Sequence, residues 1–550
     1  MLSRLLENWL DNASERSFQS PFAQILSAQG HIILHSTRHC ALEYGKDVIA
    51  MDANGKLCAF QLKGNPGSRL TLNQFKEIQN QLFQLITQPV IRPGEKPEPH
   101  ISYLVTNGLL EEEVQRAIDD LNRGYEHATT KPIGFPIKTI SRGQLLSYAN
   151  DMGVALWPSE LKDINNILSL MTLNGKDIWP NEVYHKLLVP LLGLDENENI
   201  NSQTELKRKI TSAALLTSMC LKNFEIENNH LAIITAWITF SAYTVAACQK
   251  QGFDYPRTGM PSVLISEQRI FQALFELCEE ITSREHLVEG DIFVDCFTYH
   301  ARFTLLISLM AVYYLWSEEY GWQKEDQKIS TENFLNAKSS QLYLWGEGAV
   351  PQFLTYFWYL RKTNATAMPD HFLASFLRQI IMISLNKNGN GLPGPYYKFE
   401  DITKHILRDF LSLKEDPFGG ETFRNTSFFA SSIMNLLVRT NLKQTCKSLW
   451  PDISKMTFRH FQPSQPCQYC LWRAPQGEDL QVQPKLTKEW SELVLESRNI
   501  ACPEVPEALK NDKYLLILFV ILFPFRGTPN VIRYLGKVFN DCWFIDDPIN

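Results

Sequence analysis

Three polar side chains stand close together in one segment of the chain, and their types suit the hydrolysis of phosphodiesters. Residues 42–65 read LEYGKDVIAMDANGKLCAFQLKGN and contain Asp47, Gln61 and Lys63. A carboxylate and an amide oxygen are hard ligands of the kind that Mg²⁺ and Mn²⁺ prefer. A lysine beside such an ion can orient a water molecule and stabilise the charge that develops on a phosphate group. The segment therefore predicts a metal-dependent hydrolytic site, provided that the three side chains share one face.

The turn between two predicted strands decides whether these side chains meet. Side chains alternate along a strand, so Gln61 and Lys63 share a face. A two-residue loop would place Asp47 on the opposite face. A three-residue loop at residues 53–55 pairs Asp47 with Gln61, and it ends in a left-handed residue that glycine tolerates best. The second register is predicted, because Gly55 stands at that position.

The first 155 residues alternate between β-like and helix-like runs. Their β-branched and apolar content predicts strands at residues 32–36, 47–51, 57–62, 101–106 and 136–140. Helices are predicted at residues 20–30, 72–87, 111–124 and 142–151, with Ser20 as the N-cap of the first. This order predicts a small α/β unit with a mixed central sheet.

The acid Asp47, followed by Gln61 and Lys63 in this order of elements, resembles the motif of the PD-(D/E)XK nuclease superfamily. The segment is most similar to the Mrr-like restriction endonucleases and the Holliday-junction resolvases, over about residues 15–155. The resemblance implies a restriction-endonuclease-like domain that cleaves nucleic-acid backbones with a divalent metal ion. It also implies that Asp47 is the metal-binding acid, that Lys63 is the catalytic lysine, and that Gln61 replaces the second acid, as in the Mrr-like branch.

One position departs from the pattern of that family. Mrr-like members often carry a Phe-Glu pair in the first helix, upstream of a glycine, and counting back from Gly30 reaches Phe18 and Gln19 instead. Glu43 is therefore expected to be the additional acid and a metal ligand. The alternative is that Glu43 only pairs with Lys46 in solvent.

The rest of the chain predicts a mostly α protein of several domains. At 550 residues the chain is too long for one compact core. After Trp157 the strand signal nearly vanishes, and helical patterns run to about residue 460. We therefore expect a nuclease-like domain at residues 1–155, a helical sensor or interaction domain at 156–460, and a C-terminal helical lobe at 461–550.

One apolar run raises the question of a membrane. Residues 231–248 are long enough to span a bilayer. However, they contain Thr, Ser and Tyr, and they are not flanked at both ends by the aromatic or basic residues that mark a membrane-spanning helix. A helix that is apolar all round is usually a buried core helix, so no membrane association is expected. The 11 cysteines are thinly spread and odd in number, which favours a reducing cytoplasm.

Two further motifs each match only part of a known binding-site pattern. Cys467 and Cys470 have the spacing of half a zinc site, but no second CxxC exists, so a structural Zn²⁺ is the less favoured interpretation. The glycine-rich segment NGNGLPG at residues 388–394 follows no clear strand and lacks the lysine of a phosphate-binding loop. It is predicted to be a flexible loop.

The motif and the resemblance together predict a Mg²⁺- or Mn²⁺-dependent DNA endonuclease, with RNA not excluded as the substrate. The helical region is expected to bind a protein partner or a second copy and to regulate the nuclease, as in an effector of a bacterial anti-phage defence or restriction system. The alternative is a non-catalytic module that binds nucleic acid or protein and keeps a degenerate nuclease core. The net charge of −7 argues against a generally basic nucleic-acid coat but leaves room for a local basic cleft.

Overall fold

The chain divides into two compact units, Met1–Ala273 and Leu274–Asn550. The computed structural model describes residues 2–36, 45–90, 97–128, 131–151, 161–195, 198–284, 296–320, 325–363, 368–406, 418, 423–473 and 477–539. The first unit begins with an α/β part and continues with helices, and the second unit is mostly helical.

The α/β part contains the expected elements in the expected order. Its strands are β1 (Ile32–His35), β2 (Val48–Met51), β3 (Leu57–Lys63), β4 (Arg69–Leu70), β5 (Ile101–Thr106), β6 (Leu109–Leu110) and β7 (Ile137–Ile140). Its helices are α1 (Leu2–Leu10), α2 (Glu15–Ala28), α3 (Leu72–Thr87), α4 (Glu112–Glu126) and α5 (Arg142–Asp151). All five predicted strands and the last three predicted helices are confirmed to within two residues at each end.

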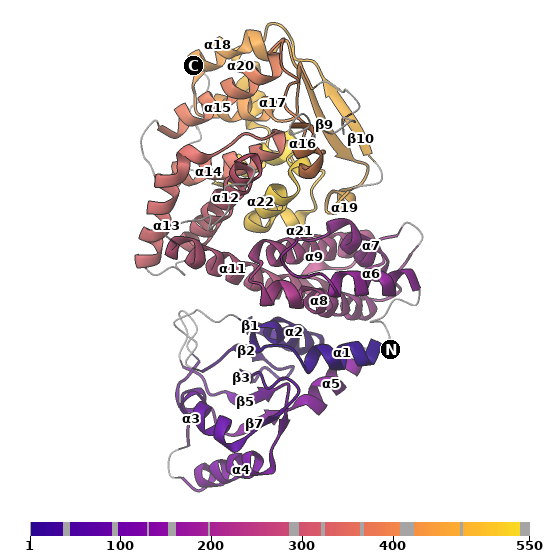
Figure 1. The fold of residues 1–550 in the computed structure, drawn as a ribbon, viewed down its shortest axis with the longest axis vertical. Helices are drawn as coiled ribbons and strands as arrows, with labels where there is room; N and C mark the ends of the chain where they lie inside the picture. The colour runs from indigo at the N-terminus through magenta and orange to yellow at the C-terminus, as the bar shows by residue number, and fades with distance from the viewer. Residues whose placement is uncertain are drawn as a thin grey trace. The chain divides into compact units, whose positions relative to one another are not determined.

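The central sheet is mixed, as predicted. Its strand order is β1-β2-β3-β5-β7, which can be followed in Figure 1. Strands β1, β2 and β3 are antiparallel neighbours, whereas β3, β5 and β7 run parallel. One face buries apolar side chains such as Ala59 and Leu104 against α3 and α4. On the other face, Phe22 of α2 meets Phe60 of β3 edge to face at 5.3 Å.

The first long helix begins earlier than predicted. Helix α2 starts at Glu15, and its N-cap is Ser14, whose hydroxyl accepts a hydrogen bond from the backbone N–H of Ser17 at 3.2 Å. The sequence Ser20-Pro21 imitates a helix start because proline is favoured in the first turn. Here Pro21 lies inside the helix, where it removes one backbone hydrogen bond. Burial of every side chain from Ser17 to Leu26 offsets that loss.

Helix α2 is buried because it is covered on two sides. The sheet lies on one side, and on the other Ile25 packs against Leu215 of α8 (Gln203–Ile226). Gln24 donates a hydrogen bond to the carbonyl of Ser262 at 2.9 Å, in α11 (Met260–Ser283). The remaining helices of the first unit are α6 (Leu161–Met171), α7 (Asn181–Leu191), α9 (His230–Gln251) and α10 (Tyr255–Thr258).

Helix α9 contains the apolar run that is long enough to cross a bilayer. Among the described residues it is the one helix that passes this test of length and composition, and 94% of its most apolar window is buried inside the protein. This burial is what the sequence predicts for a core helix.

The second unit is built mainly from helices. They are α12 (Cys296–Tyr320), α13 (Glu325–Lys338), α14 (Val350–Thr363), α15 (Met368–Leu385), α16 (Phe399–Ile406), α17 (Ala430–Arg439), α18 (Lys443–Ile453), α19 (Pro466–Tyr469), α20 (Trp490–Arg498), α21 (Glu507–Lys510), α22 (Lys513–Leu522) and α23 (Pro529–Phe539). The described part of this unit also contains three short 3₁₀ helices, η1 (Ser339–Gln341), η2 (Glu347–Ala349) and η3 (Pro524–Arg526).

The expectation of a wholly helical region after residue 156 needs one correction. The second unit contains a three-stranded sheet in the order β10-β9-β8, formed by β8 (Thr426–Ser427), β9 (Thr457–Pro463) and β10 (Gly477–Val482). Strand β10 is exposed at five of its six residues. An exposed edge strand needs few apolar side chains, so its sequence carries little strand signal.

Candidate active site

The β2–β3 hairpin has the register that the sequence predicts. Met51 pairs with Leu57, and the turn closes with a hydrogen bond from the N–H of Gly55 to the carbonyl of Asp52 at 2.9 Å. Gly55 has a φ of +76°, the left-handed conformation that a three-residue loop requires. The register brings Asp47 to the side of the hairpin where Gln61 lies.

The Asp47 carboxylate is fixed against strand β3. Its Oδ2 atom accepts one hydrogen bond from Nε2 of Gln61 and another from the backbone N–H of Leu62, each at 2.6 Å. The backbone N–H of Asp47 donates to the carbonyl of Phe60 at 2.8 Å. The predicted meeting of Asp47 and Gln61 is therefore confirmed, and Lys63 follows Gln61 on the same face of the strand.

Gln61 has an oxygen atom that needs a partner. The side chain is only 3% exposed, and its Oε1 atom is buried without a hydrogen bond to any of the described residues. Gly45 lies beside it: a Cβ there would come 3.4 Å from Oε1 and 2.5 Å from the carbonyl oxygen of Gln81. An amide oxygen left in this state costs free energy unless something binds it.

Glu15 belongs to this site, although the sequence reasoning missed it. Its Oε2 atom lies 3.5 Å from Nζ of Lys63, and the two side chains are 24% and 18% exposed. The close approach depends on Gly64, because a Cβ there would lie 2.8 Å from the backbone nitrogen of Glu15. Ser14 followed directly by an acid is an N-terminal helix signal, and it would have placed Glu15 in the first turn.

Gln19 stands at the position where Mrr-like nucleases often carry a glutamate. Its Nε2 atom donates hydrogen bonds to two carbonyl oxygens, that of Ser36 at 3.1 Å and that of Asp47 at 2.8 Å. The amide thus holds the backbone that carries Asp47. Glu15 lies four residues earlier, on the same side of α2. Helix α2 does bring a carboxylate next to Lys63, one turn before the position that the resemblance indicates.

The expectations for Glu43 and its neighbour have different outcomes. Glu43 lies outside the described residues, so its role as a metal ligand stays a prediction. Lys46, which the alternative placed in solvent, is only 1% exposed. Burial lowers the pKa of the Lys46 ammonium group to about 8, because the charged form loses hydration.

The oxygen donors at this site are of the types that a hard divalent cation prefers. Asp47 and Glu15 offer carboxylates, and Gln61 offers the buried amide oxygen. Mg²⁺ and Mn²⁺ favour such oxygen ligands, and Mg²⁺ usually keeps several waters beside one or two carboxylates. Among the described residues no group of three or more His, Cys, Asp and Glu side chains could hold a metal ion. A cation here would therefore rely on Gln61 and on water.

The CxxC pair has the environment of core thiols in the part of the chain that the structure describes. Cys467 and Cys470 are buried thiols that form no disulfide among the described residues, and burial raises the pKa of the Cys470 thiol well above its usual value. Zinc needs thiolates and further ligands, and the described residues do not supply a complete set.

Comparisons with known proteins found no match to this chain among protein-family models, curated proteins or solved structures. The site's own geometry is therefore the basis for inferring a function.

Proposed function

We propose that this chain is a metal-dependent endonuclease of the PD-(D/E)XK superfamily that hydrolyses phosphodiester bonds of DNA. One observation carries the proposal: the Asp47 carboxylate is hydrogen-bonded to Gln61 and to the backbone of β3, beside Lys63. The mixed sheet and the order of its strands support it. So does Glu15, which adds a second carboxylate next to Lys63.

The residues of the site have separable roles in this proposal. Asp47, Glu15 and the Oε1 atom of Gln61 would hold Mg²⁺ or Mn²⁺, which supplies Lewis acidity and a bound water of lowered pKa. Lys63 would orient the attacking water and stabilise negative charge on the phosphate. Its amino group is kept at the site by Glu15, at 3.5 Å. Strand β3 carries Gln61 and Lys63 on a hydrogen-bonded backbone between β2 and β5, which limits their movement.

The biological setting is proposed by analogy with the resembling family. The chain would act in the cytoplasm without a membrane, on DNA, with RNA as a second substrate to test. The helical region would regulate or recruit the nuclease through a protein partner or a second copy, as in an effector of anti-phage defence or restriction. The burial of α2 between the sheet and helices α8 and α11 supports regulation, because α2 carries Glu15.

A second candidate function is a non-catalytic module that binds nucleic acid or protein with a degenerate nuclease core. The site's small number of acids favours it. The described residues contribute two carboxylates and one amide, and Oδ2 of Asp47 already accepts two hydrogen bonds. The two candidates differ in whether the purified chain cuts nucleic acid.

The test is cleavage of supercoiled plasmid DNA by the full chain, with Mg²⁺, with Mn²⁺ and with EDTA, beside a single-stranded RNA substrate. We expect nicking that needs the metal ion. Asp47→Asn should lower the rate at least about 100-fold, because it removes charge but keeps an oxygen acceptor, and Lys63→Ala should do the same. Glu15→Gln should also lower the rate. Its matched control is Glu112→Gln, since Glu112 is also an acid in the first turn of a helix but is 90% exposed.

Cleavage that survives both Asp47→Asn and Lys63→Ala would contradict the assignment of the site. No cleavage of DNA or RNA, combined with tight binding of either, would favour the non-catalytic module.

A further inference from the structure

The second unit contains a cavity that has no part in the nuclease proposal. Its volume is about 530 Å³, within the range of roughly 300–1,000 Å³ that small-molecule sites occupy. The loop before α16, strand β9 and strand β8 contribute to its lining, as do Glu347 of η2 and Asp479 of β10. Segments far apart in the sequence thus converge on one space.

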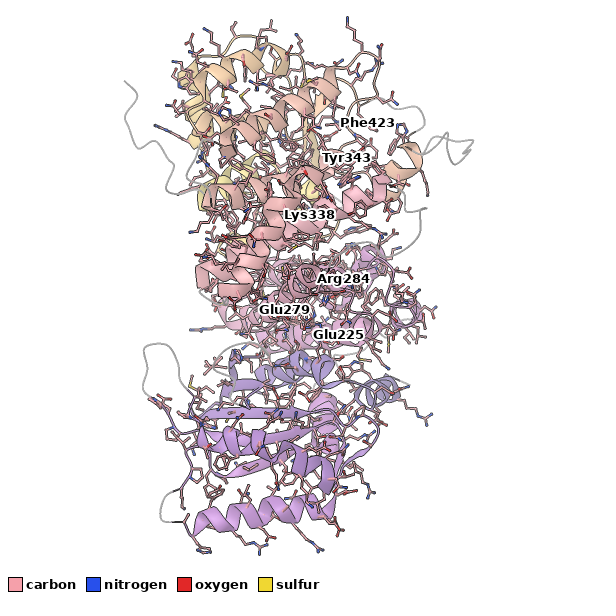
Figure 2. All side chains as sticks on the ribbon, turned by 60° about the vertical axis from the view of Figure 1, so that its left-hand side comes forward. Glu225, Glu279, Arg284, Lys338, Tyr343 and Phe423 are labelled. Carbon is pink, nitrogen blue, oxygen red and sulfur yellow. The ribbon has the colours of Figure 1, made fainter. Side chains whose placement is uncertain are left out.

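Aromatic rings form much of the wall. The lining includes Tyr396, Tyr397, Phe423, Phe428 and Phe461, of which Phe423 is labelled in Figure 2. Tyr396 also stacks on Phe525 at 5.2 Å, which fixes its ring from the side of the core. Aromatic side chains in the wall of a cavity bind planar ring systems by stacked or edge-to-face contacts.

Cationic side chains stand at the same cavity. Arg459 and Phe461 are two residues apart on β9, so they share a face, and Asp479 lies opposite Phe461 on β10. Arg459 is fixed by an ion pair with Asp479 at 2.6 Å. Arg473 donates a hydrogen bond to the carbonyl of Tyr396 at 3.2 Å. Among the described residues no carboxylate pairs with Arg473, so its charge is available to an anion.

Two polar groups of the cavity lining lie below the surface. Glu347 is 2% exposed, accepts a hydrogen bond from the backbone N–H of Phe428 at 2.6 Å, and is also hydrogen-bonded by the hydroxyl of Ser427. The hydroxyl oxygen of Tyr396 is buried and has no hydrogen-bond partner among the described residues. A buried hydroxyl of this kind is stabilised by a ligand that supplies the missing partner.

The glycine-rich segment at residues 388–394 is a loop, as the sequence predicts, and part of it lines this cavity. Gly391 has a φ of +81° and forms a bridge with Phe423, where a Cβ would come 2.5 Å from the Phe423 backbone. The carbonyl of Asn390 accepts a hydrogen bond from the N–H of Phe423 at 2.8 Å. The glycine thus brings Leu392 and Gly394 into the lining.

We propose that this cavity binds a mononucleotide, with the base among the aromatic rings and the phosphate at Arg473 and Arg459. A nucleotide joins the two chemistries that the lining offers, a planar ring system and an anion. The base edge finds hydrogen-bonding groups in the Tyr396 hydroxyl and the Glu347 carboxyl group. The acids Asp401 and Asp479 also line the cavity. Because Asp479 is paired with Arg459, Arg473 is the main attraction for the phosphate, since no described carboxylate forms an ion pair with it.

The test is isothermal titration calorimetry of the full chain in EDTA with AMP, GMP, CMP and UMP, each in turn. We expect at least one of them to bind one-to-one. The matching nucleoside and inorganic phosphate should each bind at least about tenfold more weakly, because each lacks one of the two recognised groups. Arg473→Ala should weaken binding at least about tenfold, and Tyr396→Phe should weaken it while leaving the ring in place.

The control is Arg378→Ala, which removes an exposed arginine of α15 that does not line the cavity and should leave the affinity unchanged. Thermal unfolding of each variant shows that it is folded. The proposal is overturned if none of the four nucleotides binds in the millimolar range, if inorganic phosphate binds as tightly as the nucleotide, or if Arg473→Ala has no effect. The measurement contains no cleavage step, so its failure leaves the nuclease proposal untouched.

Discussion

Asp47 illustrates how one side chain can serve both the fold and the chemistry. Its Oδ2 atom accepts hydrogen bonds from the side chain of Gln61 and the backbone of Leu62, and these contacts hold the carboxylate at the end of strand β3. The same contacts leave the Oε1 atom of Gln61 without a hydrogen bond to any of the residues that the structure describes. A structural role alone explains the first observation, whereas a bound cation would explain the second as well.

Two substitutions at Asp47 separate these roles. Asp47→Ala leaves the buried N–H of Leu62 without an acceptor, so we expect it to lower the free energy of unfolding by about 1–3 kcal/mol. Asp47→Asn retains an oxygen acceptor and should cost less than about 1 kcal/mol. Urea denaturation followed by tryptophan fluorescence measures both values. Equal losses in the two variants would show that the acceptor is not what stabilises the hairpin.

Glu347 makes a pH-dependent contribution to the stability of the second unit. Burial raises the pKa of its carboxyl group from 4.5 to about 7, so the folded chain holds this proton more tightly than the unfolded chain does. The contribution of Glu347 to stability is therefore largest below pH 4.5, and it is lost as the pH rises to about 7.

In the variant Glu347→Gln the side chain is neutral at every pH. Its amide oxygen can still accept the hydrogen bond from the backbone N–H of Phe428, and its NH₂ group can donate a hydrogen bond to the hydroxyl of Ser427. Between pH 4.5 and 8 we expect the wild-type chain to lose up to about 3 kcal/mol more stability than this variant, from about 1.4 kcal/mol per unit of pKa. Urea denaturation at the two pH values measures the difference. Parallel pH profiles for the two chains would refute this account of Glu347.

At the scale of elements, local signals predict the hairpin well because they agree with its three-dimensional setting. The register follows from one glycine at the end of a three-residue loop, and Gly55 has the φ of +76° that this loop needs. The start of α2 was predicted wrongly because two local start signals compete, Ser14-Glu15 and Ser20-Pro21. Ser20-Pro21 is a good local start, and only the burial of the whole helix makes a proline at position 21 tolerable. Because the predicted helix began at residue 20, the predicted site did not include Glu15.

Substitutions of glycine test the hairpin turn. Gly55→Ala places a Cβ in open space, so only the left-handed backbone is strained, and we expect a loss of about 1 kcal/mol. Gly124→Ala is the matched control, because a Cβ at Gly124 also has no atom within 4 Å. Gly124 lies in helix α4, where replacing glycine by alanine should stabilise the protein by up to about 1 kcal/mol. Thermal unfolding of the two variants should show shifts of opposite sign. Shifts of the same sign would contradict the left-handed turn.

At the scale of the whole molecule, the described contacts join the α/β part to the helices that follow it in the first unit. Helix α2 lies between the sheet and α8, with Ile25 against Leu215. The same helix carries Glu15 at its start and Gln19 on the backbone of Asp47. A displacement of the covering helices would therefore act on the candidate site through α2, and no sequence pattern reveals this arrangement because it depends on packing between distant segments.

Leu215→Ala tests this packing. A large-to-small change in a core costs roughly 2–5 kcal/mol, and here the cavity would open beside α2. We expect faster amide hydrogen exchange in α2, between Ser17 and Leu26, and unchanged exchange in α4, which lies on the other face of the sheet. Exchange that increases equally in both helices would indicate a general loss of stability and not a local coupling.

In the function proposed above, Asp47, Gln61 and Glu15 form a metal site beside Lys63. Binding of Mn²⁺ to the full chain without nucleic acid tests it most directly, because binding requires no trigger, partner or substrate. Calorimetry should show Mn²⁺ binding that is at least about tenfold weaker in Asp47→Asn and unchanged in Glu112→Gln. Equal Mn²⁺ affinity in the wild-type chain and in Asp47→Asn would contradict the claim.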